Sequence, residues 1–204
     1  MAAPITHIVL SDKVFERYFQ DKDKQEFIVG TSLPDIRYLG AIERDKSHHK
    51  NMTLKDILKS GSFDAGLKFH SLVDEVREKY MKNNYYYSLF PKSALLTQAS
   101  KVFEDRVLYD KLNNWKEIVS YFNKIYQDEL DLGILESAIE KWHKLLRNYF
   151  SQKPEDKNTV AFTLGMGFPI ERAEEILSVI QNAEAKKAEQ LELEFYDNFE
   201  SLLY

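Results

Sequence analysis

The sequence predicts an all-α protein, a multi-helix bundle with a C-terminal amphipathic helical segment. Of its 204 residues, 44% are hydrophobic and 13% are aromatic, which is enough to fill a sizeable core. Only seven glycines and five prolines interrupt the chain, and apolar residues recur at helical spacing along most of it. We expect residues 1–152 to form one helical domain, with a linker and helices over 153–204 that pack on it or extend from it.

Charge and cysteine content narrow the possible functions. The chain has no cysteine, which excludes disulfides, thiolate zinc sites and cysteine nucleophiles. Its net charge of −5 argues against an extended nucleic-acid groove, because such grooves need a surplus of Lys and Arg. The first residues lack the basic and apolar regions of an export signal, and no apolar run approaches the roughly 18 residues of a membrane span. A cytoplasmic protein is therefore expected.

The first 60 residues are expected to alternate short helices with breaks. Pro4 can begin a helix that places His7 on its inward face. Asp35 follows a proline at a break between elements, where polar site residues often lie. Residues 43–50 indicate a loop, and Thr53 is placed to cap the short helix that follows it.

A longer helix is predicted over residues 62–82, with a main apolar stripe on one side. A second stripe holds Phe63, Leu67 and Met81 together with His70 and Asp74. Because residues four apart stand one above the other on a helix, His70 and Asp74 share this partly apolar face.

Three further helices are predicted over residues 92–112, 114–128 and 131–152. A linker over 153–157 and a turn over 165–169 precede a charged amphipathic helix, or pair of helices, that begins at Ile170.

The histidines are arranged in a way that suggests a metal site, since four of the five lie in the first 70 residues. A helical metal hydrolase needs imidazoles and carboxylates that converge from several elements on one cation. The candidate ligands are His7, Asp35, His48 or His49, His70 and Asp74. Each has a simpler explanation: a buried core histidine, a helix cap, an exposed loop histidine or a hydrogen-bonded pair.

The order of these residues resembles the pattern of the zinc-dependent phospholipase C family, which is related to the single-strand nucleases of the S1/P1 type. The matching motifs are Thr6-His7, Gly30-x-x-x-Pro34-Asp35, Ser47-His48 and Gly66-x-x-x-His70-x-x-x-Asp74, all within about the first 80 residues. The resemblance implies an all-α bundle that binds up to three zinc ions. It further implies that Asp35 is the base and that His7, His48, His70 and Asp74 are metal ligands.

The later part of that pattern is missing. The family continues with another histidine and an HxxxE pair, whereas His143 is followed four residues later by Arg147. The third metal site of the family is therefore expected to be absent or rebuilt.

Two other resemblances are weaker. HD-type phosphohydrolases, and the acyl-carrier-protein phosphodiesterases similar to them, add a late carboxylate that Glu104 or Asp105 could supply. Both residues fall outside the apolar stripe of their helix, so we expect them to be solvated. The turn at Met166-Gly-Phe168 is similar to that of ubiquitin-associated domains, but the charged residues 184–194 fit that module poorly.

The sequence therefore predicts a metal-dependent phosphoric ester hydrolase, similar to a phospholipase C or a phosphodiesterase. Its cofactor would be a divalent metal, with zinc first and manganese or iron as alternatives. Asp35 would activate water, and Arg37 would bind a phosphate oxygen of a small phosphorylated substrate or a phospholipid head group. The alternative is a non-catalytic all-α interaction protein with a structural or decayed metal site.

Overall fold

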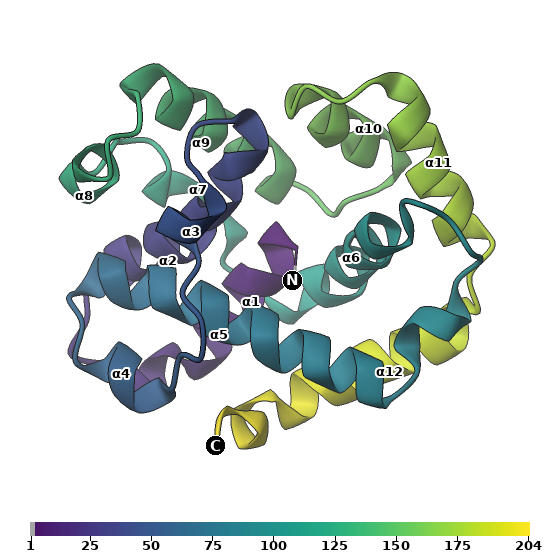
Figure 1. Cartoon of the computed structure of the whole chain (residues 1–204), viewed down its shortest axis with the longest axis horizontal. Coiled ribbons are helices and arrows are strands. Elements are labelled where there is room, and N and C mark those ends of the chain that lie inside the picture. The colour runs from purple at the N-terminus through teal and green to yellow at the C-terminus, as the bar shows by residue number, and fades with distance from the viewer. Residues whose placement is uncertain (1–2) are drawn as a thin grey trace.

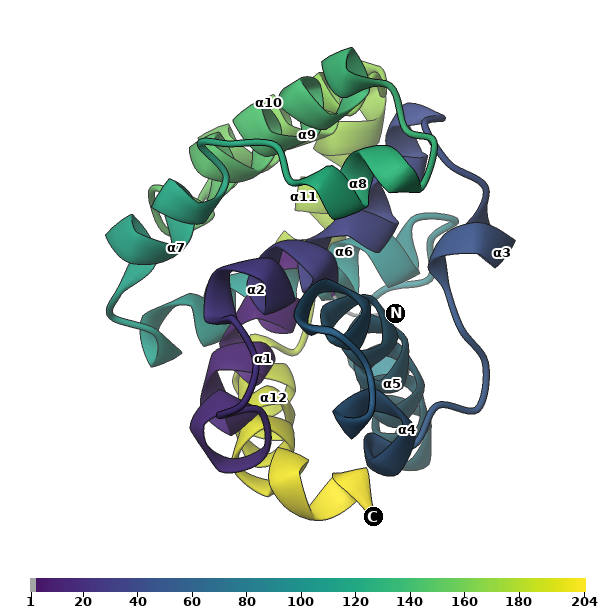
Figure 2. The same cartoon turned by 90° about the vertical axis from the view of Figure 1, so that its left-hand side faces the viewer.

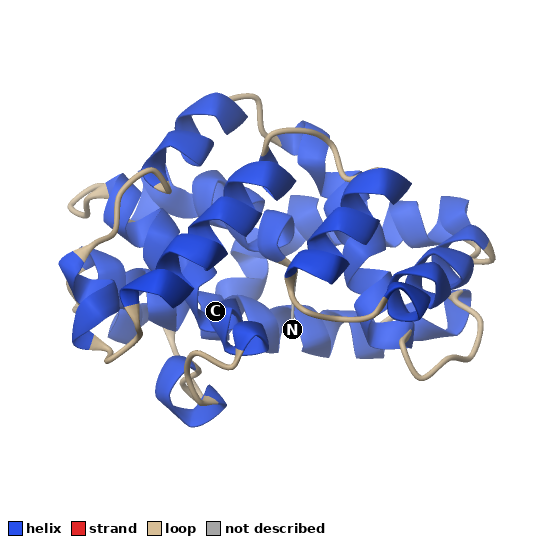
Figure 3. Ribbon diagram, turned by 90° about the horizontal axis from the view of Figure 1, so that it is seen from above, coloured by secondary structure: helices blue, strands red, loops and turns tan. Residues whose placement is uncertain are grey.

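The computed structural model describes residues 3–204, and within this range the chain forms only helices and connecting loops (Figure 3). The all-α prediction is confirmed. None of the helices described is long and apolar enough to cross a membrane. The helices in chain order are α1 (Pro4–Tyr18), α2 (Lys24–Ser32), η1 (Leu33–Leu39), α3 (Arg44–Ser47), α4 (Leu54–Leu58), α5 (Ser62–Asn83), η2 (Tyr86–Leu89), α6 (Leu96–Leu108), η3 (Tyr109–Lys111), α7 (Trp115–Tyr121), α8 (Gln127–Asp131), α9 (Glu136–Phe150), α10 (Asp156–Gly165), α11 (Ile170–Gln181), α12 (Ala185–Asn198) and η4 (Phe199–Leu203).

Helix α1 lies in the middle of the molecule and contributes to both of its apolar clusters (Figure 1). Leu10 and Phe15 belong to a cluster with α5, α6 and α12, whereas Ile5 and Ile8 belong to one with α2, α7 and α9. Nine of its fifteen residues are buried, because other helices surround it. Its inward residue His7 is 1% exposed, as the sequence predicts.

Helices α2 and α5 cross so closely that each presents a glycine to the backbone of the other. A Cβ atom at Gly30 would lie 2.2 Å from the carbonyl oxygen of Phe63, and one at Gly66 would lie 2.1 Å from that of Phe27. No other side chain would fit at either position. The two glycines therefore set the distance between the helices that carry Thr31 and His70.

Helix α6 is buried on more sides than its sequence suggests, because α1, α11 and α12 all pack against it. The expectation that Glu104 and Asp105 are solvated is wrong, since both are 0% exposed. Glu104 pairs with the buried Arg77 at 2.7 Å. Asp105 accepts hydrogen bonds from the backbone and hydroxyl of Thr6 and from Tyr149. The apolar periodicity missed this face because its polar groups have partners inside the protein.

The C-terminal helices pack on the rest of the chain, as Figures 1 and 2 show. Helix α10 packs against α9 and α11, while α11 and α12 both pack against α6. The turn before α11 has Gly167 at a φ of 86°, and α12 lies on α6 and η2, where it buries Phe195. Helix α12 is thus part of the main body and does not close a separate ubiquitin-associated module with α10 and α11.

Two local differences from the sequence prediction concern short elements. The expected loop at 43–50 contains the single turn α3, and the expected helix at 114–128 is divided into α7 and α8. The division occurs before Tyr126, whose backbone N–H donates to the side chain of Glu129 and so begins a new helix.

Substitution of Gly66 by Ala should lower the free energy of unfolding by about 2–3 kcal/mol, because the added methyl forces the α2 backbone away from α5. The matched control is Gly61→Ala, where a Cβ meets nothing within 4 Å and loss of the glycine cap costs less than about 1 kcal/mol. Urea unfolding of both variants measures the difference. Equal stability of the two would contradict the close crossing.

Candidate metal centre

The five candidate ligands come together from four separate parts of the chain. His7 lies on α1, Asp35 on η1, His48 just after α3, and His70 and Asp74 on α5. Their ligand atoms form two groups, His7 with His70 and Asp74, and Asp35 with His48 and His70. Within each group these atoms lie within 4.8 Å of one another. Such an arrangement fits a bound cation.

The adjacent histidines at 48 and 49 have different environments. His48 Nε2 is 3.8 Å from Asp74 Oδ2, and the His48 ring packs edge-on against His70 with centroids 5.0 Å apart. His49 has its backbone N–H bonded to Ser71 Oγ and belongs to neither group of candidate ligands. Of these two histidines, His48 is the one that lies in the cluster.

Two of the imidazoles are oriented by hydrogen bonds on their other nitrogen. His70 Nδ1 is 2.8 Å from the carbonyl oxygen of Thr31 and must donate to it, because a carbonyl can only accept. His48 Nδ1 is 2.9 Å from Ser47 Oγ. In both residues Nε2 remains to face the cluster. This arrangement is typical of metal-binding histidines, whose second nitrogen usually bonds a protein group.

His7 is held mainly by packing. Its ring stacks on that of His70 with centroids 3.8 Å apart and an angle of 14° between the planes. Its Nε2 is 3.3 Å from Asp74 Oδ1. The first turn of α1 has no capping side chain of its own, and Asp105 on α6 accepts the N–H of Thr6 instead. Asp105 therefore fixes the start of the helix that carries His7.

The electrostatics of the cluster favour the protonation states that bind metals. Burial lowers the pKa of His70 to about 3 and that of His48 to about 4, so both rings are neutral at neutral pH. Burial alone would raise the pKa of Asp35, but His70 and Lys101 lower it below its ordinary value. The pKa of Asp74 likewise lies well below its usual range, because His70 and His7 outweigh the effect of burial. Neutral imidazoles and ionised carboxylates are the forms that coordinate cations.

Several buried polar atoms of the cluster have no hydrogen-bond partner within residues 3–204. They are Nδ1 of His7, Nε2 of His48 and Oδ1 of Asp35. Buried polar groups are almost always hydrogen-bonded, so three such atoms in one cluster require an explanation. A cation is the partner that nitrogen and carboxylate lone pairs would share.

Two basic side chains border the cluster. Arg37 Nη2 is 3.9 Å from Asp35 Oδ1 and donates to the Tyr38 hydroxyl at 2.8 Å. Lys101 on α6 is 8% exposed, and its pKa is lowered by burial despite the opposing effect of Asp35 and Asp74. Lys101 could not be recognised from the sequence, because it lies off the apolar stripe of α6. Its sequence context is distinguished only by the nearby charged residues Glu104 and Asp105, which are buried in the structure as Lys101 is.

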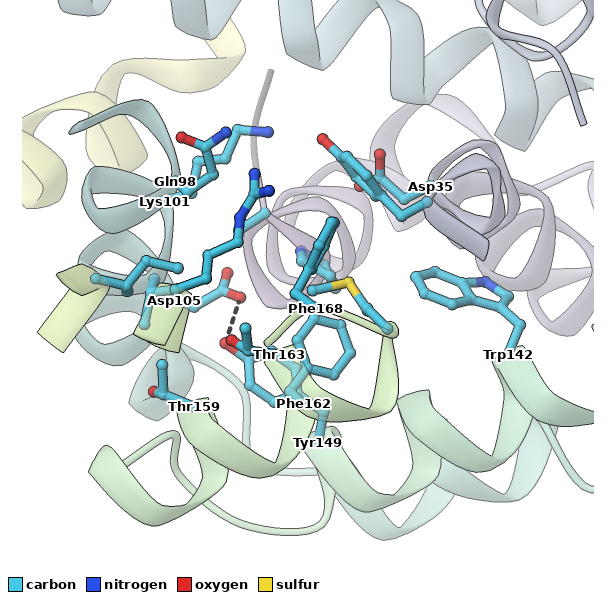
Figure 4. Close-up of a pocket in the computed structure, with 17 residues that line it drawn as sticks. Asp35, Gln98, Lys101, Asp105, Trp142, Tyr149, Thr159, Phe162, Thr163 and Phe168 are labelled. Carbon is cyan, nitrogen blue, oxygen red and sulfur yellow. Dashed lines mark hydrogen bonds between the residues drawn. The ribbon is translucent and has the colours of Figure 1, made fainter. Parts of the chain in front are cut away.

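The cluster can be approached from two cavities. An open pocket of about 850 Å³ is lined by His48 and Asp74, among others. A smaller cavity of about 80 Å³ reaches Asp35 between α6, α9, α10 and α11 (Figure 4). Both cavities therefore border the buried cluster.

His143 takes no part in the cluster. Its Nε2 lies 2.8 Å from Glu129 Oε1 in a separate buried pair, and its ring packs on Phe122.

Comparisons of the chain with protein-family models, with curated proteins and with solved structures give no match. The case for a function therefore depends on the site itself.

The neutral state of His70 predicts how stability depends on pH. Its pKa in the folded protein is about 3, below the ordinary 6.5, so the unfolded chain takes up the proton first on acidification. The free energy of unfolding therefore has its full value above pH 6.5 and falls as the pH is lowered toward 3. Between pH 6.5 and 4.5, the metal-free protein should lose about 2 kcal/mol more than His70→Asn, whose amide can still donate to Thr31. Urea titrations at both pH values measure this difference, and parallel losses would contradict a buried neutral ring.

Proposed function

We propose that this chain is a metal-dependent phosphoric ester hydrolase. The observation that carries the proposal is the set of buried imidazole and carboxylate groups whose ligand atoms converge around His70 Nε2. His7, His70 and Asp74 would hold a cation, and Asp35 and His48 would complete its coordination or hold a second one. The two groups share His70, and because its Nδ1 bonds Thr31, its Nε2 can bind one cation only. A second cation would therefore require a carboxylate that bridges the two ions.

The ligand set favours zinc, since it combines imidazole nitrogen with carboxylate oxygen, while manganese and iron accept the same donors. Such a cation would act as a Lewis acid and would lower the pKa of a bound water toward neutrality. The protein's own groups would do the rest. Asp35 would accept a proton from the attacking water, and Arg37 and Lys101 would stabilise the negative charge on the phosphoryl oxygens.

The charge around the cluster is mixed. Arg37 and Lys101 border it and would bind the oxygens of an anionic substrate, whereas the open pocket beside His48 and Asp74 contains Arg44 and Lys50 together with Glu43, Asp45, Glu75 and Glu78. A pocket of about 850 Å³ is large enough for a small phosphorylated molecule or a phospholipid head group.

Removal of single ligands tests the proposal. Protein purified without a histidine tag should contain stoichiometric zinc, manganese or iron, and should hydrolyse bis-p-nitrophenyl phosphate or p-nitrophenyl phosphate. His48→Ala and Asp74→Asn should lose both the metal and at least 100-fold in kcat/KM, because each removes a ligand atom. The matched control is His49→Ala, which lies next to His48 and should keep both.

Elemental analysis by inductively coupled plasma mass spectrometry and circular dichroism would accompany each assay. Folded wild-type protein that contains no metal and takes up none on addition would overturn the hydrolase proposal. Metal that binds at these residues without any phosphatase or phosphodiesterase activity would favour the alternative, a structural site in an interaction protein.

A further inference from the structure

The cavity of about 80 Å³ beside Asp35 has mainly apolar walls contributed by the C-terminal half of the chain. Its apolar lining includes Trp142, Tyr149, Phe162, Met166, Phe168 and Ile176. Figure 4 shows the aromatic side chains of Phe162 and Phe168 in the cavity, with Asp35 at its border. Asp35 thus belongs both to this cavity and to the candidate metal centre.

The polar lining of the cavity combines Lys101 and Arg172 with the carboxyl groups of Asp35 and Asp105, and burial raises the pKa of Asp105 to about 7. Gln98 and Lys101 on α6 lie across the cavity from Asp35 (Figure 4). Arg172 on α11 also lines it, with its guanidinium 4.1 Å from the centre of the Phe168 ring. Among residues 3–204, Asp35 and Asp74 act on Lys101 electrostatically, but no carboxylate forms a direct ion pair with Lys101 or Arg172. Lys101 is more than nine-tenths buried, and a buried ammonium without a direct partner favours the binding of an anion.

The size of the cavity limits what can enter it. Its volume of about 80 Å³ is roughly half that of the ~150 Å³ engineered cavity that accepts benzene. A short alkyl group fits this space, whereas a pair of acyl chains does not. An apolar lining of this kind excludes water and stabilises each methylene that it covers.

We propose that this cavity binds the short apolar alcohol group of a phosphoric ester while Lys101 and Arg172 bind its phosphoryl oxygens. The inference rests on the proposed function and specifies its substrate class. The phosphoryl group lies at Asp35, where this cavity meets the candidate metal centre, and the apolar group points toward Phe162 and Phe168. Helices α10 and α11 then act as the specificity-determining wall of the site.

Two phosphonates, which have no ester bond to hydrolyse, distinguish binding of the phosphoryl group from binding of the alkyl group. Binding of methylphosphonate and n-butylphosphonate to the zinc-loaded full chain would be measured by isothermal titration calorimetry. Each buried methylene contributes about fourfold in affinity, so n-butylphosphonate should bind about 50-fold more tightly than methylphosphonate. A preference of at least tenfold is expected even if one methylene stays exposed.

Variants should affect the tail and the head group separately. Thr163→Leu fills part of the cavity and should reduce the preference for n-butylphosphonate to less than threefold, with methylphosphonate binding unchanged. Ala161→Leu on the exposed side of the same helix should keep the wild-type preference.

Lys101→Met should lower the affinity for both phosphonates by about tenfold and leave the ratio of the two affinities unchanged. The reason is that the substitution removes the charge but keeps a long side chain in the wall of the cavity. Lys79→Met, an exposed position on α5, should change neither affinity.

The zinc content of every sample distinguishes failure of the inference from failure of the proposed function. Wild-type protein that takes up neither zinc nor manganese nor iron would overturn both. Zinc-loaded protein that binds neither phosphonate, or binds the two equally, would overturn the inference alone. Persistence of the wild-type preference in Thr163→Leu would show that the alkyl group binds elsewhere and would also overturn it.

Discussion

The close crossing of α2 and α5 is the constraint on which the candidate metal centre depends. Gly30 and Gly66 allow the two backbones to approach to a distance that any Cβ would prevent. One turn beyond Gly66, the imidazole of His70 reaches the carbonyl of Thr31 on the opposite helix. That hydrogen bond directs Nε2 toward Asp74 and His7, so the same contact that packs the helices also orients the central ligand.

The second constraint is the burial of α6 between α1, α11 and α12. Within the five residues 101–105, this helix places three charged side chains inside the protein, and each has a defined role. Asp105 caps α1, Glu104 pairs with Arg77, and Lys101 lines the small cavity. Glu192 on α12 is also fully buried, and burial and the charge of Glu104 raise its pKa well above the usual value. A neutral Glu192 avoids repulsion with Glu104 beside a single arginine.

The sequence predicted those features that depend on local pattern. The periodicity of α5 identified the face shared by His70 and Asp74, and the Thr53 cap of α4 is present as a capping box with Asp56. The convergence of His7, Asp35, His48, His70 and Asp74 was expected only as a set, because spacing along the chain does not fix distances between helices. The reason for glycine at positions 30 and 66 of the motif is seen only in the structure, where α2 and α5 cross closely at these residues.

The features that the sequence could not provide depend on tertiary contacts. Lys101, Glu104 and Asp105 have the appearance of a solvated helix face, and their burial follows from helices that are distant in the chain. The cavity beside Asp35 likewise needs residues from α9, α10 and α11 that show no motif of their own. Aromatic residues in those helices are equally consistent with simple packing until their position relative to Asp35 is known.

The most direct test of the account is the location of a bound metal. Crystals of the full chain grown with zinc, and measured on both sides of the zinc absorption edge, give an anomalous difference map that locates each ion. If the proposed centre binds zinc, a peak is expected within about 2.0–2.2 Å of His70 Nε2 and of an Asp74 oxygen. Zinc found only at surface carboxylates, or no peak at the cluster despite saturating metal, would contradict it.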